Sequence, residues 1–481
     1  MDEVALITSV NGDGFAAVVD VLTGTQMACL KSSTALPGGT ALIAGDFVVS
    51  AQAKGTALHF WAWGTEQPRL KCHAPEKLGP LAVACDGSLC AGGGVSGRVY
   101  LWEVSSGTLL RVWNAHYKAV SALTFSPDGC FLYSGGEDAM LSSWNTLEAV
   151  DSDEGNSFKS IGNPSLAATW TASEHSLPVT SVHAPPGGGR VYTSSLDRSA
   201  KAWDACSGRL LLSVTCPAFL RAVTTDPAEA FLFAGGGGGV IFQVDISATA
   251  IAATASNAAL GSSGVFSSSE GLAKRDGHDS SWGLQLPESR GIAGAGELRG
   301  SSLSREEGGD GGRRQELHGH DKAITSLAAS SDSSVLVSGS EDGSTRTWHV
   351  ASRQCVQKID APGKGGVSQV VLLPLPEALL LVRAGGGGSS GVGGGGGGGR
   401  TKQPVPLAPF DKFMRTSPKT KLGASPALDF AIGCAPVILR GVHCPRGRLG
   451  LENKIYLKTA SASTGRSGGI RAMLEALEGW G

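Results

Sequence analysis

The amino-acid sequence predicts an all-β protein: a seven-bladed β-propeller closed by pairing of N-terminal and C-terminal strands, with low-complexity insertions and a mostly disordered C-terminal tail. Three observations lead to this prediction. Four residue types recur at fixed offsets, the segments between them alternate apolar and polar residues as strands do, and a spacing of 41 or 42 residues continues through weaker copies. Propellers form large single domains, so we interpret the 481 residues as one domain with additions.

The fixed offsets define a tetrad of side chains that occurs three times. Counting back from a Trp, an Asp lies six residues earlier, a Ser or Thr ten, and a His twenty-eight. The tetrads are His116, Ser134, Asp138 and Trp144; His175, Thr193, Asp197 and Trp203; and His320, Ser338, Asp342 and Trp348. A repeat of about 40 to 45 residues that opens with Gly-His and closes with a Trp-Asp-like pair is typical of a four-stranded propeller blade.

The weaker copies keep the spacing although they lack the full tetrad. Positions equivalent to the repeat Trp fall at Val19, Trp61, Trp102, Trp144, Trp203, Val244 and Trp348. Four of the six gaps are 41 or 42 residues, and gaps of 59 and 104 predict insertions of about 17 and about 62 residues. We place these insertion loops at about 148–172 and 248–315, where the sequence is polar or rich in Ala, Ser and Gly.

The first copy begins too close to the N-terminus to contain its innermost strand. Residues 366–373, GVSQVVLL, alternate as a strand beyond the last repeat Trp and could supply it. Pairing the two ends of the chain would remove the exposed edges of an open array. We therefore predict a propeller over residues 1–376, with its first blade shared between the ends.

The remaining residues, 384–481, are predicted to form a Gly-rich linker and a basic tail. Residues 400–481 contain thirteen Lys and Arg against five Asp and Glu, although the whole chain has a formal net charge of -2. A short amphipathic helix is expected at 470–480. Such a tail could contact RNA phosphates, and a solvated tail without that role is the alternative.

Composition and termini bound the class of protein. The ten cysteines include no Cys-x-x-Cys pair and are interpreted as buried free thiols. The histidines show no metal-ligand spacing, so we expect neither a metal site nor a cofactor. The acidic N-terminus, MDEVALITS, and the lack of an apolar run of 18 residues predict a soluble intracellular protein without membrane contact.

Catalytic interpretations of the motifs are weaker than structural ones. Each tetrad holds the residue types of a hydrolytic triad, but a catalytic set occurs once, whereas this one occurs three times with a Trp. We interpret it as a buried hydrogen-bond chain. Residues 465–469, GRSGG, fit G-x-S-x-G, but no strand leads into them. The Gly runs lack G-x-x-x-x-G-K-[ST], so we predict no enzyme.

The repeats resemble the WD-repeat family, with closing pairs Trp102-Glu103, Trp203-Asp204 and Trp348-His349. A narrower resemblance lies in LHFWAW (58–63), GRVYLWEVSSGTLL (97–110), TDPAEAFLFAGGGGGVIFQVDI (225–246), HGHDKAITSLAASSDSSVLVSGSEDGSTRTWHV (318–350) and PLAPFDKF (406–413). These runs are similar to those of the WD-repeat subunit of the Rix-type ribosome-maturation complex, the IPI-three or WD-repeat-eighteen family.

That resemblance implies a non-catalytic nuclear scaffold, nucleolar or nucleoplasmic. Its partners would be the protein subunits of a Rix-type complex, including a large helical-repeat partner, and the large-subunit pre-ribosome. Its role would be removal of the second internal transcribed spacer from pre-rRNA, and the fungal branch adds replication licensing on chromatin. The family's helical C-terminal segment supports self-association, and residues 470–480 alone resemble it here.

Other kinds of WD-repeat scaffold are the alternative interpretation. A ubiquitin-ligase substrate receptor would carry Trp-Asp-x-Arg at the end of a blade, whereas Trp203 is followed by Asp204, Ala205 and Cys206. A signalling or chromatin scaffold would have the same propeller and no link to pre-ribosomes.

Overall fold

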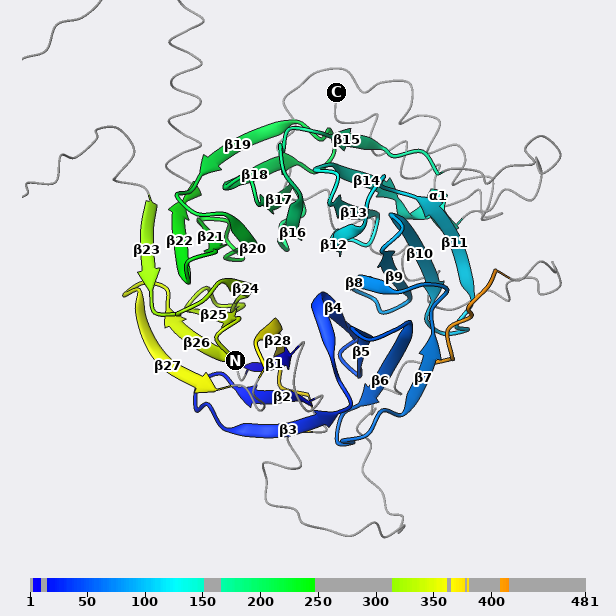
Figure 1. Cartoon of the computed structure of the whole chain (residues 1–481), viewed down its shortest axis with the longest axis horizontal. Helices are drawn as coiled ribbons and strands as arrows, with labels where there is room; N and C mark the ends of the chain where they lie inside the picture. The colour runs from blue at the N-terminus through cyan, green and yellow to red at the C-terminus, as the bar shows by residue number, and fades with distance from the viewer. Residues whose placement is uncertain are drawn as a thin grey trace, which may run out of the picture. The chain divides into compact units, whose positions relative to one another are not determined.

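Seven antiparallel sheets, each of four strands, form a ring around a central axis (Figure 1). The computed structural model describes residues 3–9, 15–150, 166–246, 314–360, 365–376, 379 and 407–414. Almost all of these residues lie in strands or in the turns between them. The predicted seven-bladed β-propeller is confirmed.

The strands of each blade are given from the innermost to the outermost. Blade 1 contains β28 (Val367–Pro374), β1 (Glu3–Ser9), β2 (Phe15–Asp20) and β3 (Gln26–Lys31). Blade 2 contains β4 (Ala35–Ile43), β5 (Phe47–Gln52), β6 (Ala57–Ala62) and β7 (Leu70–His73). Blade 3 contains β8 (Leu78–Val83), β9 (Leu89–Gly94), β10 (Arg98–Glu103) and β11 (Leu109–Asn114). Blade 4 contains β12 (Val120–Phe125), β13 (Phe131–Gly136), β14 (Leu141–Asn145) and β15 (Trp170–Ala172), with α1 (Thr146–Val150) after β14.

The other three blades follow the same order. Blade 5 contains β16 (Val179–His183), β17 (Arg190–Ser195), β18 (Ser199–Asp204) and β19 (Leu210–Thr215). Blade 6 contains β20 (Leu220–Thr225), β21 (Phe231–Gly236), β22 (Val240–Asp245) and β23 (Arg314–His318). Blade 7 contains β24 (Ile324–Ala329), β25 (Val335–Ser340), β26 (Ser344–His349) and β27 (Gln354–Asp360). Each of the seven positions equivalent to the repeat Trp lies on the third strand of its blade.

The ring closes in blade 1, as the sequence predicted. β1 pairs with β28 in antiparallel register, with Val4 opposite Leu373 and Ile7 opposite Val370. These four side chains are buried. Around the axis, the innermost strands contact one another in an unbroken series from β28 through β4, β8, β12, β16, β20 and β24 back to β28.

The apolar core is divided among the junctions between blades. Seven clusters of buried apolar side chains each join two neighbouring blades. Trp203, for example, packs with Ala122 and Tyr133 of blade 4, and Trp348 packs with Phe233 of blade 6. The repeat Trp therefore stabilises the contact between its own blade and the preceding one.

Both predicted insertions were drawn too wide. The range 148–172 contains the end of α1 and all of β15, which pairs with β14, and the range 248–315 contains the first residues of β23. Outer strands of a propeller pair on one side only and carry little apolar alternation, so their sequence looks like a loop. Residues 151–165 and 247–313, and the helix expected at 470–480, lie outside the described residues.

Part of the predicted tail belongs to the propeller. Residues 407–414, which we call the strap, lie along the outer edge of the ring beside β7 and β11, in orange in Figure 1. Phe410 in this segment is only 6% exposed. The range 384–481 is therefore corrected, because a linker and tail without contacts cannot account for a buried phenylalanine.

The cysteine interpretation was right for some thiols and wrong for others. Cys72, Cys90 and Cys216 are buried. Cys85, Cys130, Cys206 and Cys355 are exposed, because they lie in turns or on an outer strand. The thiols of Cys72, Cys90, Cys130, Cys206, Cys216 and Cys355 form no disulfide. The helices within the same residues are too short or too polar to cross a membrane.

Candidate functional site

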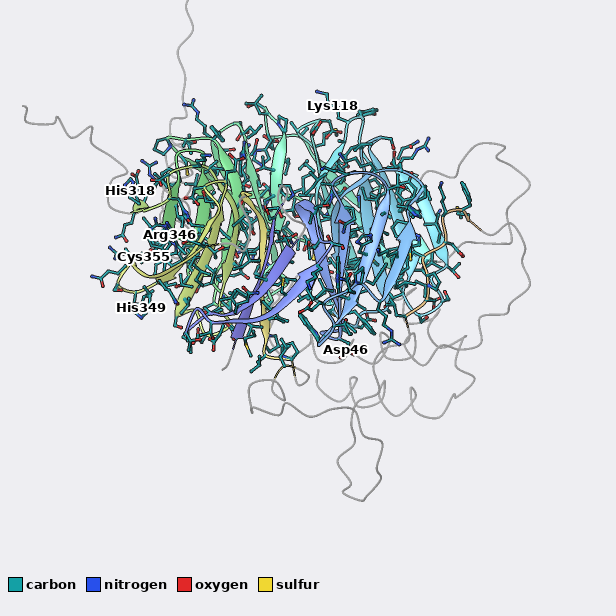
Figure 2. All side chains as sticks on the ribbon, turned by 60° about the horizontal axis from the view of Figure 1, so that its bottom comes forward. Asp46, Lys118, His318, Arg346, His349 and Cys355 are labelled. Atoms are coloured by element: carbon teal, nitrogen blue, oxygen red, sulfur yellow. The ribbon has the colours of Figure 1, made fainter. Side chains whose placement is uncertain are left out.

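The ring has two faces with different loops. The upper face carries the loops that join the outermost strand of one blade to the innermost strand of the next, such as 115–119 with Lys118. The lower face carries the turn between the first two strands of blades 2 to 7, such as 44–46 with Asp46. Lys118 and Asp46 lie on opposite sides of the ring in Figure 2.

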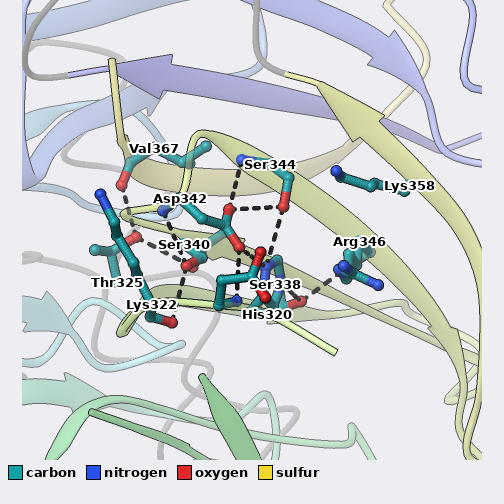
Figure 3. A network of polar contacts seen from close by, with 12 residues as sticks. His320, Lys322, Thr325, Ser338, Ser340, Asp342, Ser344, Arg346, Lys358 and Val367 are labelled. Carbon is teal, nitrogen blue, oxygen red and sulfur yellow. Dashed lines mark hydrogen bonds and ion pairs between the residues drawn. The ribbon is translucent and has the colours of Figure 1, made fainter. Parts of the chain in front are cut away.

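The tetrad of blade 7 forms one continuous chain of hydrogen bonds. Figure 3 shows three of its members, His320, Ser338 and Asp342. The indole Nε1 of Trp348 donates to Ser338 Oγ at 2.8 Å. His320 Nε2 lies 2.8 Å from the same Oγ, and His320 Nδ1 lies 2.9 Å from Asp342 Oδ2. Because the indole can only donate and the carboxylate can only accept, the Ser hydroxyl donates to Nε2 and Nδ1–H donates to the carboxylate.

The tetrads of blades 4 and 5 have the same geometry. In blade 4, Ser134 Oγ lies 2.8 Å from both His116 Nε2 and Trp144 Nε1, and His116 Nδ1 lies 3.0 Å from Asp138. In blade 5, Thr193 Oγ1 lies 2.8 Å from His175 Nε2 and 2.9 Å from Trp203 Nε1, and His175 Nδ1 lies 2.9 Å from Asp197. In each of the three blades, the structure therefore brings together the four tetrad residues that the sequence singled out.

Burial and hydrogen bonding set the pKa values of these groups. Burial lowers the pKa of His175 and of His320, and the carboxylate beside each ring opposes it only in part. Burial alone would raise the pKa of Asp342, but hydrogen bonds donated by Ser344 and His320 outweigh it and hold the pKa at about 2. Neutral His and ionised Asp are the states that the hydrogen-bond chain requires.

Each tetrad Asp also fixes an upper-face loop. Its carboxylate accepts the backbone N–H of the residue that follows the His: Tyr117 on Asp138 at 3.0 Å, Ser176 on Asp197 at 3.1 Å, and Asp321 on Asp342 at 3.1 Å. The Tyr117 side chain is 90% exposed at the tip of such a loop. The buried network therefore fixes the backbone of a loop that carries an exposed aromatic side chain.

Tyr117 has apolar neighbours on the loops of adjacent blades. The exposed apolar side chains on the upper-face loops of blades 3 to 6 are Val95, Tyr117, Leu177 and Phe219, which we call the upper-face patch. Exposed apolar side chains on successive rigid loops are typical of protein contact surfaces.

One set of polar residues escaped the sequence analysis. The innermost strand of several blades bulges near its start, and the bulged residue bonds to the next blade. Ser121 Oγ donates to the carbonyl of Val179, and Thr180 Oγ1 donates to that of Leu220 at 3.0 Å. Thr325 repeats this contact in blade 7. A hydroxyl five residues after each tetrad His was the available signal.

Blade 3 has a repeat Trp but no tetrad, and the strap replaces the missing hydroxyl. The position ten residues before Trp102 is Gly92, which has no side chain to accept from the indole. Instead, Trp102 Nε1 donates to the carbonyl of Asp411 at 3.0 Å. The Phe410 ring stacks on Trp102 with a centroid distance of 5.4 Å and meets Phe60 edge-on at 5.1 Å.

The axis of the ring is hollow. A cavity of about 190 Å³ lies at the centre of the ring, lined by the innermost strands. His183 lines it, its Nε2 has no hydrogen-bond partner among the described residues, and burial lowers its pKa to about 4. Nowhere in the described part of the chain do three His, Cys, Asp or Glu side chains gather as metal ligands. The G-x-S-x-G motif at residues 465–469 lies outside the described part of the chain.

The free energy of unfolding is expected to fall as the pH is lowered from 7 to 4. The folded-state pKa values of His175, His183 and His320 lie below the ordinary 6.5, so below that pH the unfolded chain binds protons that the folded chain cannot. The contribution of these neutral histidines to the free energy of unfolding is fully present above about pH 6.5. The contribution of His183 decreases as the pH is lowered from there to about 4. The pKa values of Asp197 and Asp342 are lowered from the ordinary 3.8 to about 2, so the free energy of unfolding decreases further as the pH falls below 3.8.

Thermal melts across this pH range test the expectation, and His183→Gln should have the shallower slope between pH 6.5 and 4. A melting temperature independent of pH in that window would contradict it.

Replacing Asp342 with alanine is expected to destabilise the protein by about 1 to 3 kcal/mol, because His320 Nδ1 and the Asp321 N–H lose their acceptor. Urea unfolding followed by circular dichroism measures the change. Asp360→Ala is the matched control, since that carboxylate is on the same blade and its side chain is 83% exposed. Equal stability of the two variants would show that the tetrad does not support the fold.

Comparisons with known proteins agree with this architecture. The family description "WD domain, G-beta repeat" matches residues 107–145, 167–204 and 311–349, and each match contains one complete tetrad. WD repeat-containing protein 18 of Bos taurus is 30% identical over 382 residues, which cover 79% of this chain and 74% of that protein. Pre-rRNA-processing protein IPI3 of Yarrowia lipolytica is 30% identical, covering 75% and 73%. Protein ROOT INITIATION DEFECTIVE 3 of Arabidopsis thaliana is 28% identical, covering 77% and 72%. None of the three names denotes an enzyme.

Proposed function

The chain belongs to the WD-repeat family of WD repeat-containing protein 18 and the pre-rRNA-processing protein IPI3, and from this premise we propose that it is a non-catalytic scaffold for maturation of the large ribosomal subunit. The observation that carries the proposal is likeness over three quarters of the chain to a relative named for pre-rRNA processing. Its place of action would be the nucleus, in the nucleolus or nucleoplasm.

The state of the tetrads supports a non-catalytic role. Ser134, Thr193 and Ser338 are the nucleophiles that a triad would use, and all three are fully buried. Each hydroxyl already accepts from an indole and lies against a His ring whose side chain is at most 1% exposed. A substrate has no path to these hydroxyls, so their hydrogen bonds serve the fold.

The upper face supports the scaffold role. Tyr117 and Leu177 lie on loops whose backbone is tied to Asp138 and Asp197, so a partner would meet loops that are already in position. A preformed surface loses less conformational entropy on binding than a mobile one. A rigid ring with fixed apolar loops suits an assembly platform for protein subunits.

The finer assignments follow from the family resemblance. We propose the protein subunits of a Rix-type complex, with a large helical-repeat partner, and the large-subunit pre-ribosome as partners, and removal of the second internal transcribed spacer as the supported step. RNA contact by the basic residues of 400–481 and self-association through 470–480 belong to the same proposal. Those residues, apart from the strap, lie outside the described part of the chain.

Depletion and rescue in the source organism would test the proposal. Loss of the protein should cause accumulation of pre-rRNA that retains the second internal transcribed spacer, measured by hybridisation, and the parent chain should reverse it. Native purification of the tagged protein should recover large-subunit precursors. Recovery of ubiquitin-ligase adaptors or licensing factors without pre-ribosomes, together with normal pre-rRNA, would replace this function by another scaffold role.

A double variant of the upper-face patch would separate binding from folding. Tyr117→Ala with Leu177→Ala should keep the parent melting temperature, because both side chains are exposed, and should reduce recovery of protein partners. Leu22→Ala with Val356→Ala removes two equally exposed apolar side chains outside that patch and serves as the matched control. Full recovery of partners by the patch variant would remove the upper face from the proposal.

A further inference from the structure

We propose that the outer side of blades 2 and 3 is a peptide-binding groove, and that its ligand is the strap of this same chain, held noncovalently as a clasp for the residues that follow. The groove takes an extended apolar segment with one phenylalanine anchor. The inference is independent of any role in ribosome maturation, because it rests only on contacts between residues 407–414 and the ring.

The anchor is Phe410, which lies between two aromatic side chains of the ring. Its ring is sandwiched by Trp102, nearly parallel at an interplanar angle of 15°, and by Phe60, which meets it edge-on at 74°. Phe410 joins the apolar cluster between blades 2 and 3, with Leu407 packed against that cluster. Phe413, three residues later in the same segment, is 73% exposed, so the groove selects one of the two phenylalanines.

Backbone hydrogen bonds fix the direction of the segment along blade 3. Ala408 N donates to the carbonyl of Val104 at 3.3 Å, and Asp411 N donates to that of Gly107 at 2.7 Å. Both acceptors lie in the turn between β10 and β11, so the main chain of that turn holds the main chain of the strap. The indole of Trp102 adds the bond to Asp411.

The groove is shaped to admit the strap closely. Gly107 has a φ of +71°, and a Cβ there would lie 2.0 Å from the carbonyl oxygen of Pro409. A side chain at this position would therefore exclude the peptide. Gly92 stands where a tetrad has its Ser or Thr, so blade 3 offers no hydroxyl to the Trp102 indole. The indole N–H is therefore left to bond to the strap.

The tether makes the clasp effective. Thirty-two residues, 375–406, join the end of β28 to Leu407, and many are glycine. A covalent tether raises the local concentration of the segment that it carries to the order of millimolar, so even a weakly bound strap stays in place. The clasp would fix the strap to the outer edge of blades 2 and 3.

Cleavage of the linker tests the clasp in the full chain. A site for a sequence-specific protease is placed within the glycine run 393–399, the purified protein is cut, and size-exclusion chromatography asks whether residues 400–481 remain with the ring. We expect them to remain, and an excess of synthetic peptide of residues 404–416 to displace them. The same peptide with alanine in place of Phe410 should bind at least about tenfold more weakly.

Matched variants identify the groove as the holding site. Phe410→Ala removes the anchor and Gly107→Ala blocks the approach, and either should release the fragment after cleavage. Phe413→Ala and Gly129→Ala are the controls, since Phe413 is exposed and Gly129 has the same φ of +71° with nothing near its Cβ. Circular dichroism shows whether each ring remains folded.

Two results would overturn the clasp. Retention of the fragment by both Phe410→Ala and Gly107→Ala would place its attachment elsewhere. Release of the fragment from the cut parent protein, with the ring still folded and the peptide not binding, would show that the groove does not hold the strap once the tether is broken.

Discussion

Replacing Ile7 with aspartate is expected to open the ring and leave most of the protein unfolded at physiological temperature. Ile7 is 1% exposed on β1, opposite Val370 of β28, in the cluster that joins blades 7 and 1. Burying an unpaired carboxylate there costs several kcal/mol, a large part of the 5 to 15 kcal/mol of a typical domain. Thermal melting by circular dichroism, and the amount of soluble protein, measure the effect.

The matched control for this closure variant is Leu22→Asp. Leu22 follows β2 in the same blade and is 68% exposed, so its replacement adds the same charge without burying it. We expect the control to melt within a degree or two of the parent. A parent-like melt of Ile7→Asp would mean that β1 does not hold the ring closed.

Closure could be predicted because it follows from arithmetic over the whole repeat. Val19 falls 42 residues before Trp61, so it marks the third strand of a blade, yet too few residues precede it to supply an innermost strand. Residues 366–373 alternate like a strand and had no other blade to join. Repetition made this long-range pairing visible, since each blade must contain the same four strands.

The tetrads could also be predicted from the sequence, because the same four residue types occur at identical offsets in three repeats. The hydroxyls of Ser121, Thr180 and Thr325 also repeat, but Ser and Thr are common in strands, and the role of these three depends on a bulge in the innermost strand of their own blade. Their contact to the next blade therefore became evident only in three dimensions.

The strap could not have been predicted as part of the ring. It occurs once, follows a glycine run, and satisfies a donor that lies about 300 residues earlier in the chain, with Asp411 accepting from Trp102. Its one signal in the sequence was the run PLAPFDKF, which belongs to the family resemblance. Composition alone placed this run in the tail.

A single requirement explains how the blades differ. A buried indole N–H needs an acceptor, and blades 4, 5 and 7 supply it from the tetrad hydroxyl. Trp61 of blade 2 uses the carbonyl of Lys31 at 3.1 Å, and Trp102 of blade 3 uses the strap. Blades 1 and 6 have Val19 and Val244 at this position and so have no donor to satisfy.

Replacing Gly97 with alanine is expected to destabilise the protein by about 3 kcal/mol or more. Gly97 lies in the upper-face turn of blade 3 with a φ of +87°, and a Cβ there would lie 2.1 Å from the carbonyl oxygen of His116 and 2.6 Å from that of Lys118. The new methyl group would push away the loop that carries His116, and with it the tetrad of blade 4. Chemical denaturation measures the loss.

Gly64→Ala separates this crowding from backbone strain. Gly64 has a similar φ of +83°, but nothing lies within 4 Å of its Cβ position, so its variant should lose only about 1 kcal/mol. The excess loss in Gly97→Ala then reports the contact with the His116 loop. Gly239 should behave like Gly97, because its Cβ would lie 2.2 Å from the carbonyl oxygen of His320. Equal losses at Gly64 and Gly97 would mean that the upper-face loops yield easily, which would also remove the argument that the tetrads hold Tyr117 in a fixed position.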